Sequence, residues 1–342
     1  MAPGAGTSSA ADSAAAAGQV AAGGHPERRF RAGERILLLL ATPLNFLVLR
    51  ALAERPMRLA DLRRATGLPP QTTLRGHLAS LCELGLIDKR QTAQMPYAVE
   101  NELTQMGHDL LLVADLLENW LAQAPDGPVA LESGRARGVV KAFVDGWSST
   151  MMRGLAARPM SLTELDRGIT ELSYPALERR LSSMRMAGLI EVREGLGVGT
   201  PYGVTEWARR GIAPLALAAD RERAHLRHRA APLDRIDIEA AFLLALPLVG
   251  LPSDVAGLSQ LEVEADPRAV HGQAGVRVTV ERGRVVACDS ELGPSPGDYA
   301  VGSAAKWFSA IRDGTTGLLR FGGRQRMAER LVSGLHAALM PR

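Results

Sequence analysis

Apolar residues recur at one-turn spacing in two distant segments of the chain, with polar residues between them. They are Leu74, Leu78 and Leu81 in the first segment, and Leu177, Leu181 and Met184 in the second. This spacing places each set on one stripe of a helix. We therefore predict two amphipathic helices, each with a buried apolar stripe and an exposed polar face.

The surroundings of these two helices also repeat. The matching landmarks are Arg55-Pro56-Met57 and Arg158-Pro159-Met160, Gly85-Leu86-Ile87 and Gly188-Leu189-Ile190, and Pro96-Tyr97 and Pro201-Tyr202. The first two pairs share an offset of 103 residues and the third has an offset of 105. Three landmarks in the same order indicate an internal repeat.

Each repeat has the same predicted anatomy, which is that of a winged helix. An apolar helix (44–53 and 147–156) precedes a short amphipathic helix (59–65 and 162–169), the striped helix follows, and a hairpin ends near Thr104 or Thr205. We expect Ser161 to cap the second short helix, with Glu164 completing a capping box.

The polar face of the striped helix would enter a major groove, and the hairpin would contact phosphates. The DNA-binding candidates are Thr72, Thr73, Arg75, His77, Ser80, Lys89 and Arg90 in the first repeat, and Tyr174, Arg179, Arg180 and Arg193 in the second. Because Glu178 would lie near phosphate, we expect the first repeat to read bases and the second to contribute more to dimer-like packing. The alternatives are a solvated face that binds only protein and, for His77, exposed polar filler.

Both repeats resemble the HxlR-type winged-helix regulators, which are relatives of the MarR group. Trp147, Arg153 and Leu155 have the family spacing, and Leu103-Thr104-Gln105-Met106-Gly107 matches the segment after the wing. The first repeat has Leu44 where the family has Trp, and in the second repeat Gly211 is displaced. Family members usually bind DNA as homodimers, so the resemblance implies a fused dimer that acts as a monomeric pseudo-dimer or dimerises further.

The C-terminal segment, from about residue 234, changes periodicity. We predict a helix over 238–248, strands at 261–265, 276–280, 284–288 and 298–301, a helix over 303–312, a strand at 318–321 and a helix over 324–339. The order resembles a sterol-carrier-protein type-two-like domain, which implies an apolar pocket between the sheet and the helices. The segment is near neutral, so we do not expect it to bind DNA.

The predicted fold class is thus α+β, with two tandem winged helix-turn-helix domains and a C-terminal α+β sandwich domain. The predicted boundaries are a disordered leader over 1–30, repeats over 31–122 and 139–228, and the C-terminal domain over 234–342. Stretches rich in Pro and Gly over 123–138, and again around 227–235, are interpreted as linkers.

Composition agrees with a bacterial, cytoplasmic DNA-binding protein. The chain has 46% hydrophobic and 23% charged residues, a net charge of +3 and two cysteines, and a pI of about 9.1. No secretion signal is recognised, and the apolar run 36–52 is interrupted by Pro43, Asn45 and Arg50, so we interpret it as buried helix and predict no membrane contact. No cofactor motif or metal-ligand spacing is present, and we predict neither.

Three tryptophans are the candidates for a ligand site. Trp120 and Trp207 flank the repeats and would line an effector cleft, although packing between helices explains them equally well. Trp147 matches a core position of the family, so core packing is favoured over ligand contact. For Cys82, which lies beside Leu78 and Leu81, an inert core thiol is favoured over a redox switch.

The sequence therefore predicts a non-enzymatic transcriptional regulator that binds double-stranded DNA and responds to an apolar or aromatic effector. A ligand-sequestering resistance protein would use the same parts. Winged-helix DNA glycosylases form a third class, but their Gln-x-Gln or Gln-x-Asp catalytic pattern is not found.

Overall fold

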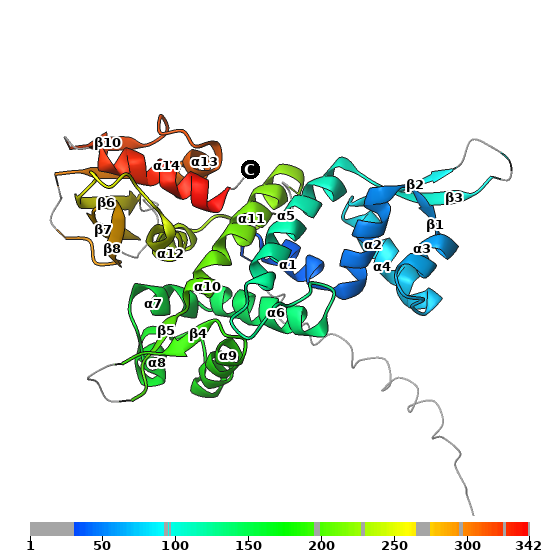
Figure 1. Ribbon diagram of the computed structural model, residues 1–342, viewed down its shortest axis with the longest axis horizontal. Helices are drawn as coiled ribbons and strands as arrows, with labels where there is room; N and C mark the ends of the chain where they lie inside the picture. The colour runs from blue at the N-terminus through cyan, green and yellow to red at the C-terminus, as the bar shows by residue number, and fades with distance from the viewer. Residues whose placement is uncertain are drawn as a thin grey trace, which may run out of the picture. The chain divides into compact units, whose positions relative to one another are not determined.

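The computed structural model describes residues 31–91, 95, 97–194, 199–226, 230–264, 274–293, 297–323 and 326–340. The leader predicted over 1–30 lies outside these residues. Figure 1 shows the order of the elements: two helical segments, each with a hairpin, and then a sheet with helices. The chain is of mixed α+β class.

The first segment, called here the first repeat, has five helices and three strands. They are α1 (Glu34–Leu40), α2 (Pro43–Glu54), β1 (Met57–Arg58), α3 (Leu59–Ala65), α4 (Gln71–Glu83), β2 (Ile87–Gln91), β3 (Val99–Leu103) and α5 (Gln105–Ala122). The strands form one antiparallel sheet in the order β1-β3-β2. The predicted helices over 44–53 and 59–65 are confirmed, and the leucine stripe of α4 is buried.

The apolar run 36–52 forms two helices rather than one. Thr42 ends α1 by donating from Oγ1 to the Leu38 carbonyl at 3.0 Å, and Pro43 occupies the first position of α2, where its missing N–H costs nothing. The two helices are bent by 81°. Among the described residues no single helix is long and apolar enough to cross a membrane, although this bent pair meets the length and composition test.

The second segment, called the second repeat, has a similar element order, but an isolated bridge replaces strand β1 and two helices replace α5. It contains α6 (Gly134–Ser148), α7 (Met151–Ala157), α8 (Leu162–Gly168), α9 (Tyr174–Met186), β4 (Ile190–Val192), β5 (Tyr202–Val204), α10 (Glu206–Arg210) and α11 (Ile212–His225). β4 and β5 pair antiparallel, and Met160 bridges to Tyr202 where β1 meets β3 in the first repeat. The stripe of α9 is buried as predicted.

The turns that close the two striped helices are made in the same way. Gly85 and Gly188 both have positive φ angles, 73° and 72°, which only glycine adopts without steric cost. Thr104 Oγ1 donates to the Gly85 carbonyl at 2.7 Å and caps α5, and Thr205 Oγ1 donates to the Gly188 carbonyl at 3.0 Å and caps α10. The sequence landmarks therefore correspond to equivalent hydrogen bonds.

Two predictions for the start of the second repeat are wrong. The expected helix over 147–156 is divided between α6 and α7, because Thr150 adopts a φ of 60°, outside the right-handed helical range. Ser149 Oγ donates to the Asp145 carbonyl at 2.6 Å at the end of α6. The expected linker over 123–138 is partly helical, since Ser133 caps α6 and Leu131 is buried.

The two repeats are joined by a tryptophan pair. Trp120 of α5 and Trp207 of α10 stack with ring centroids 4.8 Å apart and an interplanar angle of 14°. Each indole Nε1 donates to the backbone carbonyl of the other residue at 2.8 Å. Nearby, α5 packs along α11, and His225 Nε2 lies 2.7 Å from Asp109 Oδ2. The repeats are therefore held together by aromatic stacking and by paired hydrogen bonds.

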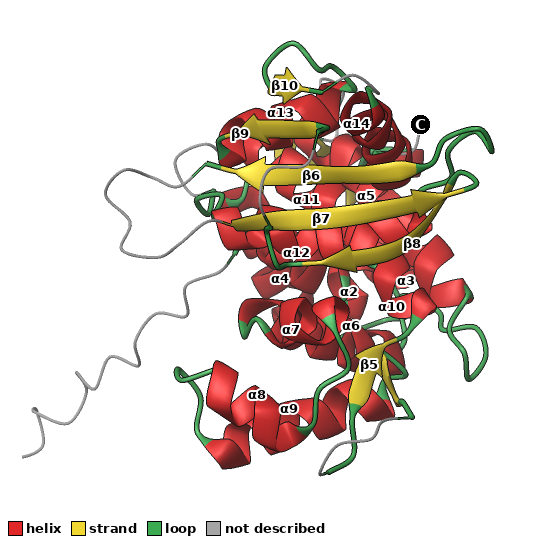
Figure 2. Ribbon diagram, turned by 90° about the vertical axis from the view of Figure 1, so that its left-hand side faces the viewer, coloured by secondary structure: helices red, strands yellow, loops and turns green. Residues whose placement is uncertain are grey.

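The C-terminal segment is a sheet covered by helices on one face, and Figure 2 shows its other face turned toward the viewer. Its elements are α12 (Arg235–Ala245), a 3-10 turn η1 (Leu246–Leu248), β6 (Gly257–Val263), β7 (Ala274–Glu281), β8 (Arg284–Asp289), β9 (Tyr299–Gly302), α13 (Ala304–Asp313), β10 (Arg320–Gly322) and α14 (Met327–Leu339). The strand order is β10-β9-β6-β7-β8, with β6 and β9 parallel and the other pairs antiparallel. The predicted elements are found with shifted ends: β6 begins four residues earlier, at Gly257, and Arg324, the expected start of the last helix, lies outside the described residues.

Aromatic side chains occupy the space between this sheet and its helices. Phe242 and Trp307 meet edge to face with centroids 4.8 Å apart, and both are fully buried. Trp307 Nε1 also donates to the Glu262 carbonyl of β6 at 2.7 Å. Alternate valines of β7 are buried beneath them, so this layer is a filled core.

Replacing Trp120 with Phe should lower the free energy of unfolding by about 1–3 kcal/mol, because the Trp207 carbonyl loses its indole donor in a buried place. Trp147→Phe is the matched control, since the buried Trp147 Nε1 has no hydrogen-bond partner among the described residues. Urea unfolding of both variants measures the difference. Equal destabilisation by the two substitutions would show that the paired hydrogen bonds contribute nothing.

Replacing Ser161 with Ala should cost about 1 kcal/mol, because it removes the α8 cap. The predicted capping box is confirmed: Glu164 N donates to Ser161 Oγ at 3.3 Å, and Ser161 N donates to Glu164 Oε2 at 2.7 Å. Ser173→Ala is the control, since Ser173 makes no capping bond to α9. A loss of stability as large in the control as in Ser161→Ala would contradict the assignment.

The same cap should depend on pH. The Ser161 amide and the Arg158 guanidinium lower the pKa of Glu164 from 4.5 to about 2. The Glu164 contribution is therefore complete above about pH 5 and is lost as the pH falls toward about 2. Glu164→Gln keeps a hydrogen-bond acceptor but removes the titration, so the stability gap between wild type and variant should narrow over this range. A difference in stability that stays constant over this pH range would contradict this explanation.

Candidate nucleic-acid interface

Helix α4 presents a polar face because its apolar stripe is fixed inward. Leu74, Leu78 and Leu81 are no more than 5% exposed. The residues on the other side are exposed: Thr72, Thr73, Arg75 and Ser80. Pro70 precedes the helix and no side chain caps its first turn. The face thus offers hydroxyl groups, one guanidinium and a helix N-terminus, all of which can bond phosphate or base edges.

His77 lies differently from the other α4 candidates. Its ring is half-buried, and Nδ1 lies 2.6 Å from Asn45 Oδ1 on α2. The ring therefore ties the striped helix to the preceding helix, which fixes the angle of the polar face. Asn45 was missed as a site residue because nothing in its spacing relates it to a residue 32 positions away.

The wing of the first repeat carries the other candidate cations. Lys89 and Arg90 are exposed on β2, and Arg90 Nη1 lies 3.6 Å from Glu102 on β3. Lys89 has no ion-pair partner in the described part of the chain and stands opposite Asn101. Lys89 is thus the better placed of the two to neutralise a phosphate.

Helix α9 presents a face of different charge. Tyr174 and Arg179 are exposed and Arg180 is half-buried, while Glu178 is exposed beside them. Tyr174, Glu178 and Arg185 line a cavity of about 370 Å³ between α9 and the wing strand β5. In this groove Glu178 repels phosphate and Arg185 attracts it, so the groove is of mixed charge.

Arg193 is turned away from a wing position. It follows β4, and its guanidinium pairs with Glu191 at 2.6 Å and lies 3.5 Å from the Val204 carbonyl. Its side chain lines a different cavity, beside the C-terminal domain. The structure therefore separates Arg193 from the DNA-binding candidates of α9.

Comparison with known proteins gives a family match within the first repeat. Residues 39–126 match the HxlR-like helix-turn-helix family, and this range spans α2 to α5 with the wing. No curated protein matches the chain. The chain contains an HxlR-like helix-turn-helix domain. Such a domain indicates a DNA-binding transcriptional regulator, and its range includes every first-repeat candidate.

Two of the three candidate ligand tryptophans, one inside the HxlR-like domain and one outside it, are used for packing. The stacked pair of Trp120 and Trp207 is 4% and 8% exposed, so in this structure the packing alternative describes the two rings. Trp147 is buried and borders a cavity of about 50 Å³, which has room for one or two water molecules.

Cys82, at the end of α4 in the HxlR-like domain, is half-buried. Burial raises the pKa of its thiol, and Lys89 opposes this only in part. A thiol that remains protonated at neutral pH is a poor nucleophile, as expected for a packing residue.

Proposed function

We propose that the chain is a ligand-responsive transcriptional regulator in which two winged helices are fused in one polypeptide. The observation that carries this proposal is the exposed polar face of α4, held by a buried leucine stripe within the HxlR-like domain. The stripe fixes which residues face outward, and these residues have the chemistry of groove contacts.

The fused-dimer arrangement is supported by the recurrence of local geometry. The glycine turns and threonine caps are equivalent in the two repeats, and α5 of one packs along α11 of the other. A chain that joins two such units has a pseudo-two-fold relation between them, and a pseudo-palindromic operator would match it.

The two halves are proposed to have different roles. Thr72, Thr73 and Arg75 would contact base edges, while Ser80, Lys89 and Arg90 would contact phosphates. In the second repeat Arg179 and Arg180 would take phosphates, with Tyr174 beside them. The acidic Glu178 explains why this half would bind DNA less tightly.

A response to a ligand would act through the arrangement of the two recognition helices. A ligand that prefers one arrangement shifts the population toward it and thereby changes DNA affinity. The C-terminal domain, for which we retain the sterol-carrier-like assignment, would supply part of the ligand site. Small-molecule sequestration is the second candidate function, and it is favoured by a cavity of about 340 Å³ between the second repeat and the C-terminal sheet.

Replacing Arg75 with Ala should weaken operator binding by about 1–3 kcal/mol and relax specificity at one base if Arg75 reads that base. Lys89→Ala should weaken binding to all sequences and lower the salt slope by about 1. The operator is selected from random duplexes, and affinity is then measured against salt concentration beside a scrambled duplex.

Arg330→Ala is the control for that measurement, because Arg330 is a half-exposed arginine in the C-terminal domain. Arg179→Ala tests the unequal roles of the two repeats and should cost less than Arg75→Ala. If Arg75→Ala left affinity and specificity unchanged, α4 would not be the reading helix. If no duplex were selected, the chain would not be a sequence-specific regulator.

A further inference from the structure

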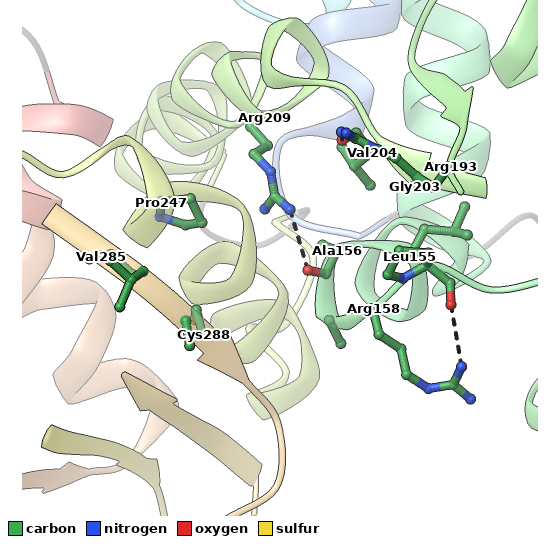
Figure 3. Close-up of a pocket in the computed structure, with 14 residues that line it drawn as sticks. Leu155, Ala156, Arg158, Arg193, Gly203, Val204, Arg209, Pro247, Val285 and Cys288 are labelled. Carbon is green, nitrogen blue, oxygen red and sulfur yellow. Dashed lines mark hydrogen bonds between the residues drawn. The ribbon is translucent and has the colours of Figure 1, made fainter. Parts of the chain in front are cut away.

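A cavity of about 340 Å³ lies where the second repeat meets the C-terminal domain. Its walls come from the end of α7, from β5 and α10 on one side, and from η1 and β8 on the other (Figure 3). Sites between domains are frequent places for small ligands, and this volume is within the range of ligand pockets.

The lining of the cavity is cationic. It includes Arg158, Arg193 and Arg209, and none of its lining residues is acidic. Arg158 pairs with Glu164 at 2.8 Å, and Figure 3 shows its guanidinium extended away from Arg209. Arg193 also pairs with a carboxylate, that of Glu191 at 2.6 Å, so Arg209 supplies the charge in the cavity that has no counter-ion among the described residues.

Arg209 is held in place without a counter-ion. Its Nη1 donates to the Leu243 carbonyl at 2.5 Å and its Nη2 to the Ala156 carbonyl at 3.4 Å. No carboxylate pairs with it among the residues that the structure describes. Burial lowers the pKa of Arg209, and the neighbouring charge of Arg193 lowers it further. Two of the five guanidinium N–H donors are used by these carbonyls, so donors remain for a ligand.

The opposite wall is apolar and uncharged. Val285 and Cys288 of β8 and Pro247 of η1 face this space. Burial raises the pKa of the Cys288 thiol to about 12, so the sulfur carries no charge at neutral pH. The cavity thus combines a positively charged side with an apolar side.

We propose that this cavity binds a small organic carboxylate, with its carboxylate group on Arg209 and Arg193 and its apolar body against Val285 and Pro247. A planar guanidinium matches a carboxylate in geometry, and such charge-assisted hydrogen bonds are strong where water is partly excluded. This class narrows the apolar or aromatic effector that the sequence predicts, because the buried positive charge selects for an anion. The ligand's effect on DNA rests on the proposed function, but the ligand site itself does not.

The test uses isothermal titration calorimetry on the full chain without DNA. The probes are a series of aliphatic and aromatic monocarboxylates that includes 4-phenylbutyrate, its neutral amide, and inorganic phosphate. We expect saturable binding of at least one carboxylate, with the matching amide about tenfold weaker or more. Phosphate should bind more weakly, because it has no apolar body.

Arg193→Gln and Arg209→Met should each weaken carboxylate binding about tenfold or more. Arg210→Gln is the matched control, because the neighbouring Arg210 pairs with Glu206 and Gln123 outside the cavity. Val285→Phe retains both arginines and narrows the cavity, so it should weaken large carboxylates more than small ones. If Arg209→Met fails to fold, Arg193→Gln and Val285→Phe still decide the question.

Binding of amide and acid with equal affinity would overturn the proposal, as would an equal loss in Arg210→Gln, or no binding by any carboxylate. DNA affinity is then measured with and without the bound carboxylate. If the chain binds a carboxylate but selects no duplex, the ligand site is supported and the proposed regulator is refuted. If the chain binds a specific duplex but no carboxylate, the regulator is supported and the ligand site is refuted.

Discussion

The stacked pair of Trp120 and Trp207 is the contact on which the arrangement of the two repeats depends. Each indole bonds the other's backbone carbonyl, so displacing either ring leaves donors and acceptors of both residues without partners. Gly211 is part of the same contact, since a Cβ there would lie 2.9 Å from ring atoms of Trp120 and Phe143. This junction therefore helps to determine how the polar faces of α4 and α9 are placed relative to each other.

Local spacing explains what the sequence could predict. The buried stripes, the turns at Gly85 and Gly188 and the Ser161 cap depend on residues a few positions apart, and the structure has all of them. The tryptophan pair joins residues 87 positions apart and has no local signal. The break at Thr150 depends on a positive φ at that residue, which periodicity does not reveal. Likewise, the leucine spacing of α4 predicts which face of the helix is exposed, but not the bond between His77 and Asn45.

Fusion of two repeats in one chain allows their surfaces to differ. In a homodimer both recognition helices carry the same residues, so an acidic group would weaken both half-sites. In the proposed regulator Glu178 would weaken only α9, and Arg193 of that repeat lines a cavity. The repeat proposed to bind DNA less tightly is thus the one that meets the C-terminal domain.

The position of Arg209 makes the contact between the second repeat and the C-terminal domain sensitive to the charge of a bound ligand. Its two carbonyl partners lie in the last turns of α7 and α12, where the helix dipoles are negative and offset part of the cation's cost. These carbonyls hold the guanidinium in place, while the remaining positive charge would attract the proposed anion. A ligand alters an equilibrium only if its affinity differs between arrangements. Because the cavity walls belong to two domains, any change in their spacing changes the site, so binding there and the spacing of the domains are coupled.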